Sequence, residues 1–479
     1  MKAQEIIDLY TTGEGEELAR DWNKILGILL PENDIKKDKF RDQFNGKHSI
    51  LTDLSRKDEW VGKGSDRRFV KKTRNILTYQ KKITNVATAF VFGKPVQITL
   101  KNQDESNKKS FEEFNKAWDD AKLDYFNRKI FRETCIETES AEIWNLINVR
   151  DASGKVVERK LRPTLITAKE GYMFAPHFDD DGMMDAFTMR YTVIKFNPVR
   201  NSEITRYKIF LDDKDIIVDY FRTKYTETII ENPFNKIRVV YYNQPDPEWG
   251  DVQGLIDRLE NISSRHGDTN DYYGGPVLKV YGELKEAPDK SQDGKYLEFE
   301  SIQDTETGKE FHGDAEYLTW DHSPESVKLE YLTLQKFIGE LSQTPDLTIE
   351  QMIKLNNFSG VALKMALMDP LIKAMNKEEV WGSGMYRRCN ILKRMLAVAN
   401  SGEGSLYENM RFGVEFQGIL PDNMMEVIDM LNAATGGQPV MSQKTAVSKN
   451  PLVDEPEEEQ DQIEKEGKIG AGSFNFPEE

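Results

Sequence analysis

The sequence predicts an elongated subunit of the α+β class. Three observations predict it: long segments have apolar residues at helical spacing, residues 143–240 have the texture of antiparallel strands, and the apolar content is low. Hydrophobic residues make up 38% of the 479 residues and charged residues 31%, which is typical of a protein that has much surface for its volume or buries surface only in an assembly. A chain of this length exceeds one compact core.

The first 60 residues predict short helices and carry no motif. Apolar residues from Ile76 to Phe90 then recur at helical spacing. Gly93 and Pro95 end this helix, because glycine suits the backbone of a helix C-terminus and proline cannot continue one. Apolar residues that alternate at 96–100 predict a strand directly after it.

Residues 110–138 predict more helix, and a strand-rich region follows. From residue 143 to 240 the chain consists of short runs rich in Ile, Val, Tyr and Phe. Polar turns separate these runs at 152–155 (ASGK), 179–182 (DDDG) and 212–215 (DDKD). This pattern predicts a meander of antiparallel strands.

Two helices that bracket a small β module are predicted next. The first helix covers 251–273, with Asp251 as its N-cap, and a Gly-Gly-Pro sequence ends it. Residues 277–320 predict short strands with polar loops. The second helix begins at the Ser323-Pro324 pair, a favourable N-cap and first-turn combination, and runs to Leu341.

A polar segment at 344–358, rich in Thr, Pro, Asp and Asn, separates the second helix from a third. Ser359 caps the third helix, and its apolar face runs through residues 361–375. Pro370 lies inside this pattern and predicts a kink, because proline removes a helical hydrogen bond. Helical spacing then continues to about residue 400.

The C-terminal part predicts a helix at 421–435, a Gly-Gly break and a short helix capped by Ser442. Residues 454–466 contain eight acidic side chains and one lysine. Such a charge run predicts that the end of the chain, 451–479, is solvated and partly disordered.

Composition and motifs exclude several classes of protein. The net charge of −17 argues against general DNA binding, since affinity for phosphates depends on Lys and Arg. No G-x-x-x-x-G-K-[ST], G-x-S-x-G, H-E-x-x-H or paired C-x-x-C motif occurs, so we expect no NTP-driven motor and no familiar hydrolase site. No hydrophobic leader and no apolar run near 18 residues occurs, so we expect neither a signal peptide nor a membrane span.

The two cysteines, Cys135 and Cys389, allow one disulfide, but two free thiols in a reducing compartment fit this pattern better. Cys389 follows Arg387 and Arg388, which would lower the pKa of a thiol if it were exposed. The alternative is that Cys389 is a buried helix residue, and we favour it.

One acidic cluster raises the question of catalysis. Asp179, Asp181 and Asp185 supply the oxygen ligands that a divalent ion requires, as in a metal-dependent nuclease. The alternative is a hairpin turn, because strand-like apolar residues flank the cluster and the spacing of a calcium loop is absent. No second carboxylate cluster that would complete a nuclease site can be recognised.

Several basic residues stand out only by position. Lys354 lies in the polar segment beside Asn356 and Asn357, and Arg258 and Arg265 share one face of the 251–273 helix because they are seven residues apart. In an isolated chain these residues would be ordinary solvated surface.

Five strings, in this order, resemble the portal proteins of tailed bacteriophages with long non-contractile tails. The likeness spans about residues 66–466, although each string alone is weak. The strings are TNVATAFVFGKPV (84–96), NPFNKIRVVYYNQPDPEWGDVQGLIDRLENISSRHGD (232–268), EYLTWD (316–321), FSGVALKMALMDPLIKA (358–374) and SQKTAVSKNPLVDEPEEEQDQIEKE (442–466).

The resemblance implies a homo-oligomeric ring of twelve subunits at one vertex of the virion capsid, assembled in the host cytoplasm. Double-stranded DNA would pass transiently through its channel, without a cofactor, a bound metal, catalysis or a membrane. The implied partners are the terminase large subunit, a head-completion or adaptor protein, and the major capsid and scaffolding proteins.

The resemblance also implies a division of the chain into named parts. These are a wing (1–250), a first stem helix (251–273), a clip (274–322), a second stem helix (323–343), a tunnel loop (344–358), a long kinked helix that returns to the wing (359–400), a crown (401–450) and an acidic tail (451–479).

Within this division, a mostly negative channel would repel DNA and let it slide, and a few basic residues would guide it. A metal-dependent nuclease and another head–tail adaptor remain as alternatives, although adaptor chains are usually much shorter. The candidates for channel contacts with DNA are Lys354, Asn356, Asn357, Lys336, Arg258 and Arg265.

Overall fold

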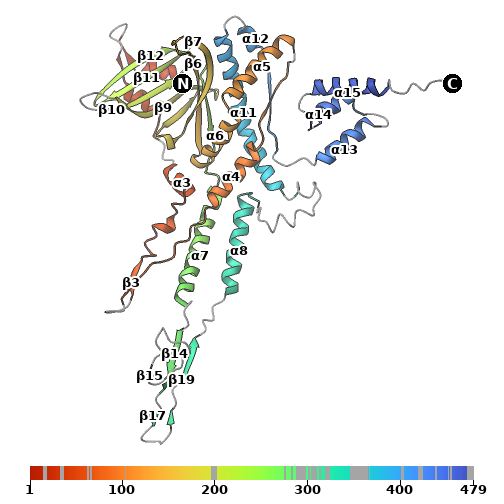
Figure 1. The fold of residues 1–479 in the computed structure, drawn as a ribbon. Helices are drawn as coiled ribbons and strands as arrows, with labels where there is room; N and C mark the ends of the chain where they lie inside the picture. The colour runs from red at the N-terminus through yellow and green to blue at the C-terminus, as the bar shows by residue number, and fades with distance from the viewer. Residues whose placement is uncertain are drawn as a thin grey trace, which may run out of the picture.

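Figure 1 shows the chain in a computed structural model as an elongated α+β subunit, which confirms the predicted fold class. A wide body lies at one end, a stalk of two long helices descends from it, and three C-terminal helices lie to one side. The structure describes all residues except 14–18, 33–36, 62–63, 65–66, 103, 196–201, 274–276, 282–283, 287–297, 300–301, 304–309, 312–313, 319–323, 346–364, 366, 401–403, 419–423, 437–439, 451, 454–455 and 472–479.

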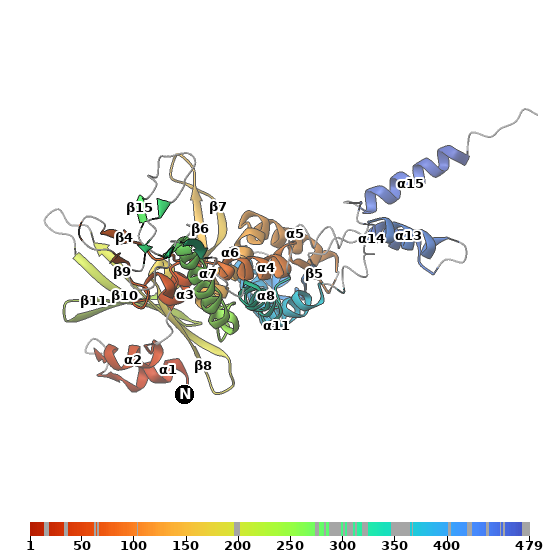
Figure 2. The same ribbon diagram turned by 90° about the horizontal axis from the view of Figure 1, so that it is seen from below.

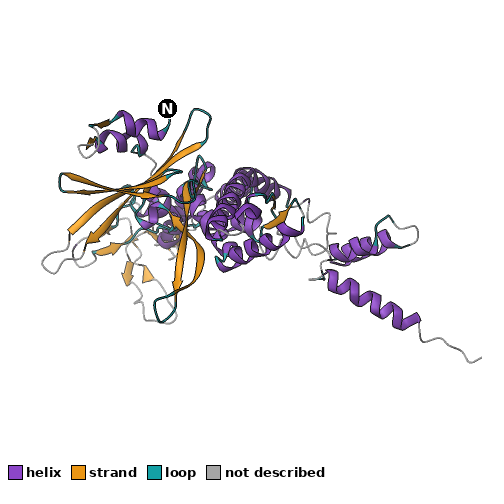
Figure 3. Ribbon diagram, turned by 90° about the horizontal axis from the view of Figure 1, so that it is seen from above, coloured by secondary structure: helices purple, strands orange, loops and turns teal. Residues whose placement is uncertain are grey.

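A five-stranded antiparallel sheet forms one side of the body, in the order β12-β11-β10-β9-β8. Two N-terminal helices, α1 (Ala3–Leu9) and α2 (Trp22–Leu29), pack on it through a cluster that includes Ile25 and Ile209. This arrangement, visible in Figure 3, confirms the predicted antiparallel meander for residues 173–231. The strands are β8 (Met173–Phe178), β9 (Met184–Lys195), β10 (Ser202–Phe210), β11 (Lys214–Phe221) and β12 (Lys224–Glu231).

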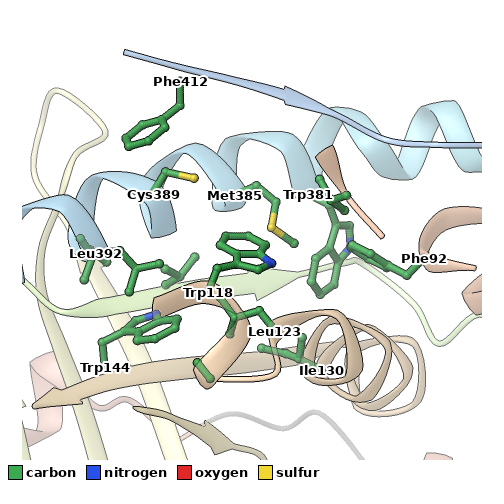
Figure 4. Packing of buried hydrophobic residues seen from close by; sticks show 14 of the residues in the cluster. Phe92, Trp118, Leu123, Ile130, Trp144, Trp381, Met385, Cys389, Leu392 and Phe412 are labelled. Atoms are coloured by element: carbon green, nitrogen blue, oxygen red, sulfur yellow. The ribbon is translucent and has the colours of Figure 1, made fainter. Parts of the chain in front are cut away.

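A second, three-stranded sheet in the order β13-β6-β7 carries the main core of the body on its helix-facing side. Figure 4 shows aromatic and sulfur-containing side chains of this core, including Trp118, Trp144, Trp381 and Cys389. The elements around it are β6 (Glu139–Arg150), β7 (Val156–Ile166), β13 (Val239–Asn243), α4 (Tyr79–Phe92), α5 (Glu105–Asp120), α6 (Leu123–Glu137) and α11 (Met368–Ala399).

One glycine permits a close approach between helix α11 and strand β13. The ring of Tyr242 on β13 stacks on Trp381 of α11 with ring centres 4.0 Å apart. A Cβ atom at Gly384, one turn along α11, would lie 2.2 Å from the Tyr242 ring. The helix therefore reaches the strand only because residue 384 has no side chain.

After α11 the chain packs again against elements from the first part of the body. Helix α12 (Gly404–Glu408) packs beside α11, and strand β20 (Phe412–Glu415) pairs with β5 (Gln97–Leu100). Tyr407 and Phe412 belong to the main core. The described residues from 404 to 415 therefore pack with the body, whereas the division implied by the resemblance assigns them to the crown.

The stalk contains α7 (Gln253–Tyr273) and α8 (Pro324–Leu341), and both predicted helices are confirmed. Asp251 does not cap α7, because it lies inside a short 3-10 turn, Gly250–Val252, that leads into the helix. Beyond the stalk lie short antiparallel strand pairs, as predicted. These strands are β14 (Val277–Tyr281), β15 (Leu284–Glu286), β16 (Glu298–Phe299), β17 (Ile302–Gln303), β18 (Glu310–Phe311) and β19 (Asp314–Leu318).

Pro370 does not kink a helix in the way that the sequence predicted. Helix α11 begins at Met368, so Pro370 is its third residue. The amide groups in the first turn of a helix have no acceptors within the helix, so a proline there removes no helical hydrogen bond. The predicted cap Ser359 lies outside the described residues.

Three helices form the C-terminal part: α13 (Met424–Thr435), α14 (Gln443–Lys449) and α15 (Pro456–Ala471). Ser442 caps α14 as predicted, since its hydroxyl accepts a hydrogen bond from the Thr445 amide. Within the end of the chain that was predicted to be solvated and partly disordered, residues 456–471 are helical. Proline at the first position followed by glutamates suits a helix N-terminus, where the helix dipole favours negative charge.

Candidate functional site

The two stalk helices pack through apolar faces near the body. Val252, Ile256 and Leu259 of the α7 segment are buried against a cluster that includes Ile338 of α8. Farther along the stalk, the Arg258 guanidinium donates two hydrogen bonds, of 3.0 and 2.8 Å, to one oxygen of Glu330 on α8. The pair is half-exposed, so its net contribution to stability is at most about 1 kcal/mol.

A second segment runs along the stalk. Residues 52–78, which we call the arm, contain strands β3 (Glu59–Val61) and β4 (Arg68–Val70) and descend beside α7 (Figure 1). The arm is fastened to α7 by polar contacts of its flanks, which include the Arg56–Asp268 ion pair at 2.5 Å.

The stalk joins the body at a buried ionic junction. The Glu248 carboxylate lies between two ammonium groups of α11, at 2.7 Å from Lys373 Nζ and 2.8 Å from Lys377 Nζ. These lysines face the same way because they are four residues apart on a helix. Lys373 also donates to the carbonyl oxygen of Ser342, just after α8, at 2.8 Å. The junction therefore links α11, the end of α8 and the segment that precedes α7.

The ionised form of Glu248 is strongly stabilised by its surroundings. Burial raises the pKa of its carboxyl group, but the nearby Lys373 and Lys377 lower it by more, and the net pKa is lowered to about 2. The side chain is only 1% exposed, so water cannot replace either lysine. A cavity of about 760 Å³ lies beside the junction, between α4, α8 and the first turn of α11, and Lys336 and Pro370 contribute to its lining.

The predicted DNA-contact residues lie at different places. Arg258 and Arg265 lie on one face of α7 and are exposed. Lys336 is exposed on α8 and lies 3.5 Å from Glu340. The carboxylate contacts of Arg258 and Lys336 are exposed surface ion pairs, which contribute little to stability. The remaining candidates, Lys354, Asn356 and Asn357, lie outside the described residues.

The acidic cluster at 179–185 forms the hairpin turn between β8 and β9. The Asp179 carboxylate accepts hydrogen bonds from the amides of Asp181 and Met183, and Asp185 accepts from the Ala3 amide and contacts His177 Nδ1 at 2.6 Å. Backbone amides thus engage Asp179 and one oxygen of Asp185, as expected for a structural turn. In the described part of the chain, no group of three or more His, Cys, Asp or Glu side chains is arranged to hold a metal ion.

The two cysteines are free and buried, so no disulfide joins them. Burial raises the pKa of the Cys389 thiol to about 12, and burial likewise raises the pKa of the Cys135 thiol. The possibility of a lowered pKa at Cys389 is therefore wrong, and the buried-helix alternative is confirmed. None of the described helices is long and apolar enough to cross a membrane.

The apolar residues that predicted the start of the third helix are exposed in the single chain. Met365, Met368, Ile372 and Met375 are all at least 42% exposed, and Leu329 on α8 is 69% exposed. A monomeric protein rarely exposes several large apolar side chains to water on neighbouring segments. They indicate surfaces that another chain covers.

Comparisons with known proteins found matches over most of the chain. A family model described as phage portal protein, SPP1 Gp6-like, matches residues 32–471. A chain in the virion of a native gene transfer agent (GTA) particle has 11% identity and a TM-score of 0.37, with 87% of this chain and 92% of that chain covered.

Two further structures match at 11% identity. A chain from the neck of an empty GTA particle with C6 symmetry has a TM-score of 0.36, with 76% of this chain and 86% of that chain covered. A chain from the neck of a native GTA particle with C12 symmetry has a TM-score of 0.34, with 78% and 88% covered. A search of curated proteins found no match.

Proposed function

The chain belongs to the SPP1 Gp6-like family of phage portal proteins, and from this premise we propose how its parts act on DNA. It is a structural protein of the virion that forms a ring at one vertex of the capsid. We propose that the ring has twelve subunits and conducts double-stranded DNA during packaging and ejection without catalysis of its own. The exposed apolar surfaces on α8 and at the start of α11 support a ring, because lateral contacts would bury them.

We assign the parts of the proposed ring to elements of the fold. The body is the wing, α7 and α8 are the stem, and the strands between them are the clip. Residues 344–358 are the tunnel loop. Lys373, which pairs with Glu248, also donates to the carbonyl oxygen of Ser342, just before this loop. Because α12 and β20 pack into the body, we place the crown at residues 424–471.

The proposed partners match these parts. The clip, at the end of the subunit farthest from the body, docks the terminase large subunit during packaging and a head-completion or adaptor protein afterwards. The major capsid and scaffolding proteins contact the wing during assembly in the host cytoplasm. Lys354, Asn356 and Asn357 in the loop and Lys336, Arg258 and Arg265 on the stem make transient contacts with phosphates.

The mass and symmetry of the purified protein test the proposal directly. We expect native mass measurement and class-averaged electron images to show a closed ring of twelve copies around a central hole. A compact dimer as the largest species, with scaffolding protein present, would contradict the portal ring.

Reversing the charge at Lys354 is expected to impair DNA packaging and leave the ring intact. A glutamate there would repel the phosphates that the lysine attracts, and electrostatic guidance of DNA depends on such charges. The measurement is the yield of packaged DNA with Lys354→Glu rings, and Lys449→Glu, on α14, is the matched control. An unchanged yield would remove Lys354 from the channel contacts.

A further inference from the structure

The flanks of the arm, residues 52–78, are held against one side of α7 by polar contacts. The Asp268 carboxylate accepts hydrogen bonds from Arg56 at 2.5 Å and from the Thr73 amide at 2.7 Å, so it ties both flanks of the arm to the helix. A Cβ atom at Gly267 would lie 2.9 Å from the Thr73 side chain. The arm therefore lies as close to α7 as the glycine allows, and its strands project from a fixed base.

The described strands of the arm expose aromatic side chains. Trp60 on β3 and Phe69 on β4 are paired directly across the hairpin, with ring centres 5.3 Å apart. They are 58% and 53% exposed. The guanidinium of Arg67 lies 5.2 Å from the centre of the Trp60 ring. Leu54 is exposed as well, so the arm leaves several large apolar side chains and the cationic Arg67 uncovered within the described chain.

A matching surface lies on α8. Leu329 and Leu332 are exposed on this helix. Among its exposed charged side chains, three acids (Glu325, Glu330, Glu340) outnumber two cations (Lys328, Lys336). Among the described residues of the arm, the exposed charges are mostly of the opposite sign, since Lys57, Arg67 and Lys71 outnumber the one exposed acid, Glu59. The two surfaces are both apolar at their centre and complementary in charge at their margin, as is typical of protein interfaces.

The arm and α8 flank α7 on opposite sides. Gly267 meets the arm and Arg258 meets α8, and nine residues separate them, which is about two and a half helical turns. Figure 2, which looks along the stalk, shows the same arrangement. The arm base at Asp268 lies near the end of α7, and Leu329 lies near the start of the neighbouring α8, so the surfaces are at similar heights.

We propose that the arm of one subunit packs on the exposed face of α8 in the next copy of this chain. Surfaces on opposite sides of a subunit give a head-to-tail contact, and such contacts close into a ring. Trp60 and Phe69 lie against Leu329 and Leu332, and the arm cations face the acidic side chains of α8. This contact rests on the proposed ring and names the surfaces that hold its stem together.

The test uses two full-length variants that each carry one new surface cysteine. Glu59→Cys places a thiol beside Trp60, and Lys328→Cys places one beside Leu329; both positions are exposed. Cys135 and Cys389 are buried and do not compete for reagent. The two variants are mixed, assembled into rings and treated with a short bis-maleimide, so that a product joining both variants can form only between copies.

We expect a covalent product of the two different chains, identified by peptide mass mapping. The matched control mixes Lys328→Cys with Tyr125→Cys, an exposed position on α6 of the body, and should give no such product. Rings that form without the Glu59–Lys328 product would overturn the arm contact and leave the portal ring standing. A chain that forms no ring, with or without scaffolding protein, would overturn both.

Discussion

Replacing Arg388 with alanine is expected to lower the free energy of unfolding by about 3–5 kcal/mol, because the change strands a buried carboxylate. Arg388 and Glu142 are both 0% exposed. Arg388 Nε and Nη2 donate to the two oxygens of Glu142 at 2.7 and 2.6 Å. The guanidinium also donates to Asn127 and lies near the ring of Trp118. Alanine removes all of these contacts and leaves Glu142 without its counter-charge.

Urea unfolding monitored by tryptophan fluorescence measures this loss. The matched control is the double variant Arg388→Met with Glu142→Leu, which removes both charges and keeps most of the volume. We expect it to regain most of the stability, because replacing a buried ion pair by apolar groups is often neutral. If the double variant were as unstable as Arg388→Ala, packing of the guanidinium would be the cause and not the orphaned charge.

The location of this ion pair shows what the sequence could not reveal. Arg387 and Arg388 suggested an effect on the neighbouring thiol of Cys389, because only sequence neighbours are visible in a sequence. In the fold, the partner of Arg388 is Glu142, which is 246 residues away on β6. No local pattern distinguishes an arginine that pairs across the core from one that is solvated.

Local patterns predicted local structure well. Apolar spacing located α4, α7 and α8, and the Ser442 cap was correct in atomic detail because capping involves residues only three apart. The errors arose where two local signals compete. Pro370 would kink the helix only if the helix began well before residue 368. The glutamates after Pro456 could indicate either a disordered tail or a helix N-terminus.

The candidate site was predicted only in part. Basic residues on the stem could be selected by their spacing, but spacing does not show which of them would contact DNA. The tunnel-loop candidates lie outside the described residues. The junction at Glu248 was missed, although Lys373 and Lys377 have the spacing of one helix face. Their carboxylate partner belongs to a segment more than a hundred residues earlier, and only the fold brings the three together. The arm was missed because its exposed aromatics resemble ordinary strand residues in the sequence.

Glu248→Gln is expected to lower the free energy of unfolding by about 3 kcal/mol at neutral pH. The pKa of Glu248 falls from 4.5 to about 2 on folding, and a pKa difference of one between the two states corresponds to about 1.4 kcal/mol. Glutamine keeps the shape of the side chain but loses the charge that holds Lys373 and Lys377. The matched control, Glu340→Gln, removes an exposed carboxylate near Lys336 and should change the free energy by less than about 0.5 kcal/mol.

The pH dependence of this difference provides the sharper measurement. A carboxyl group whose pKa is lowered on folding contributes its full stability above its unfolded pKa and loses it as the pH falls toward its folded pKa. The difference in the free energy of unfolding between the natural chain and Glu248→Gln should therefore be constant above about pH 5. It should shrink between pH 4.5 and about 2. Chemical unfolding at a series of pH values measures it. A difference that stayed constant down to about pH 3 would show that the charge of Glu248 does not hold the junction, and that its shape alone positions α11 against the end of α8.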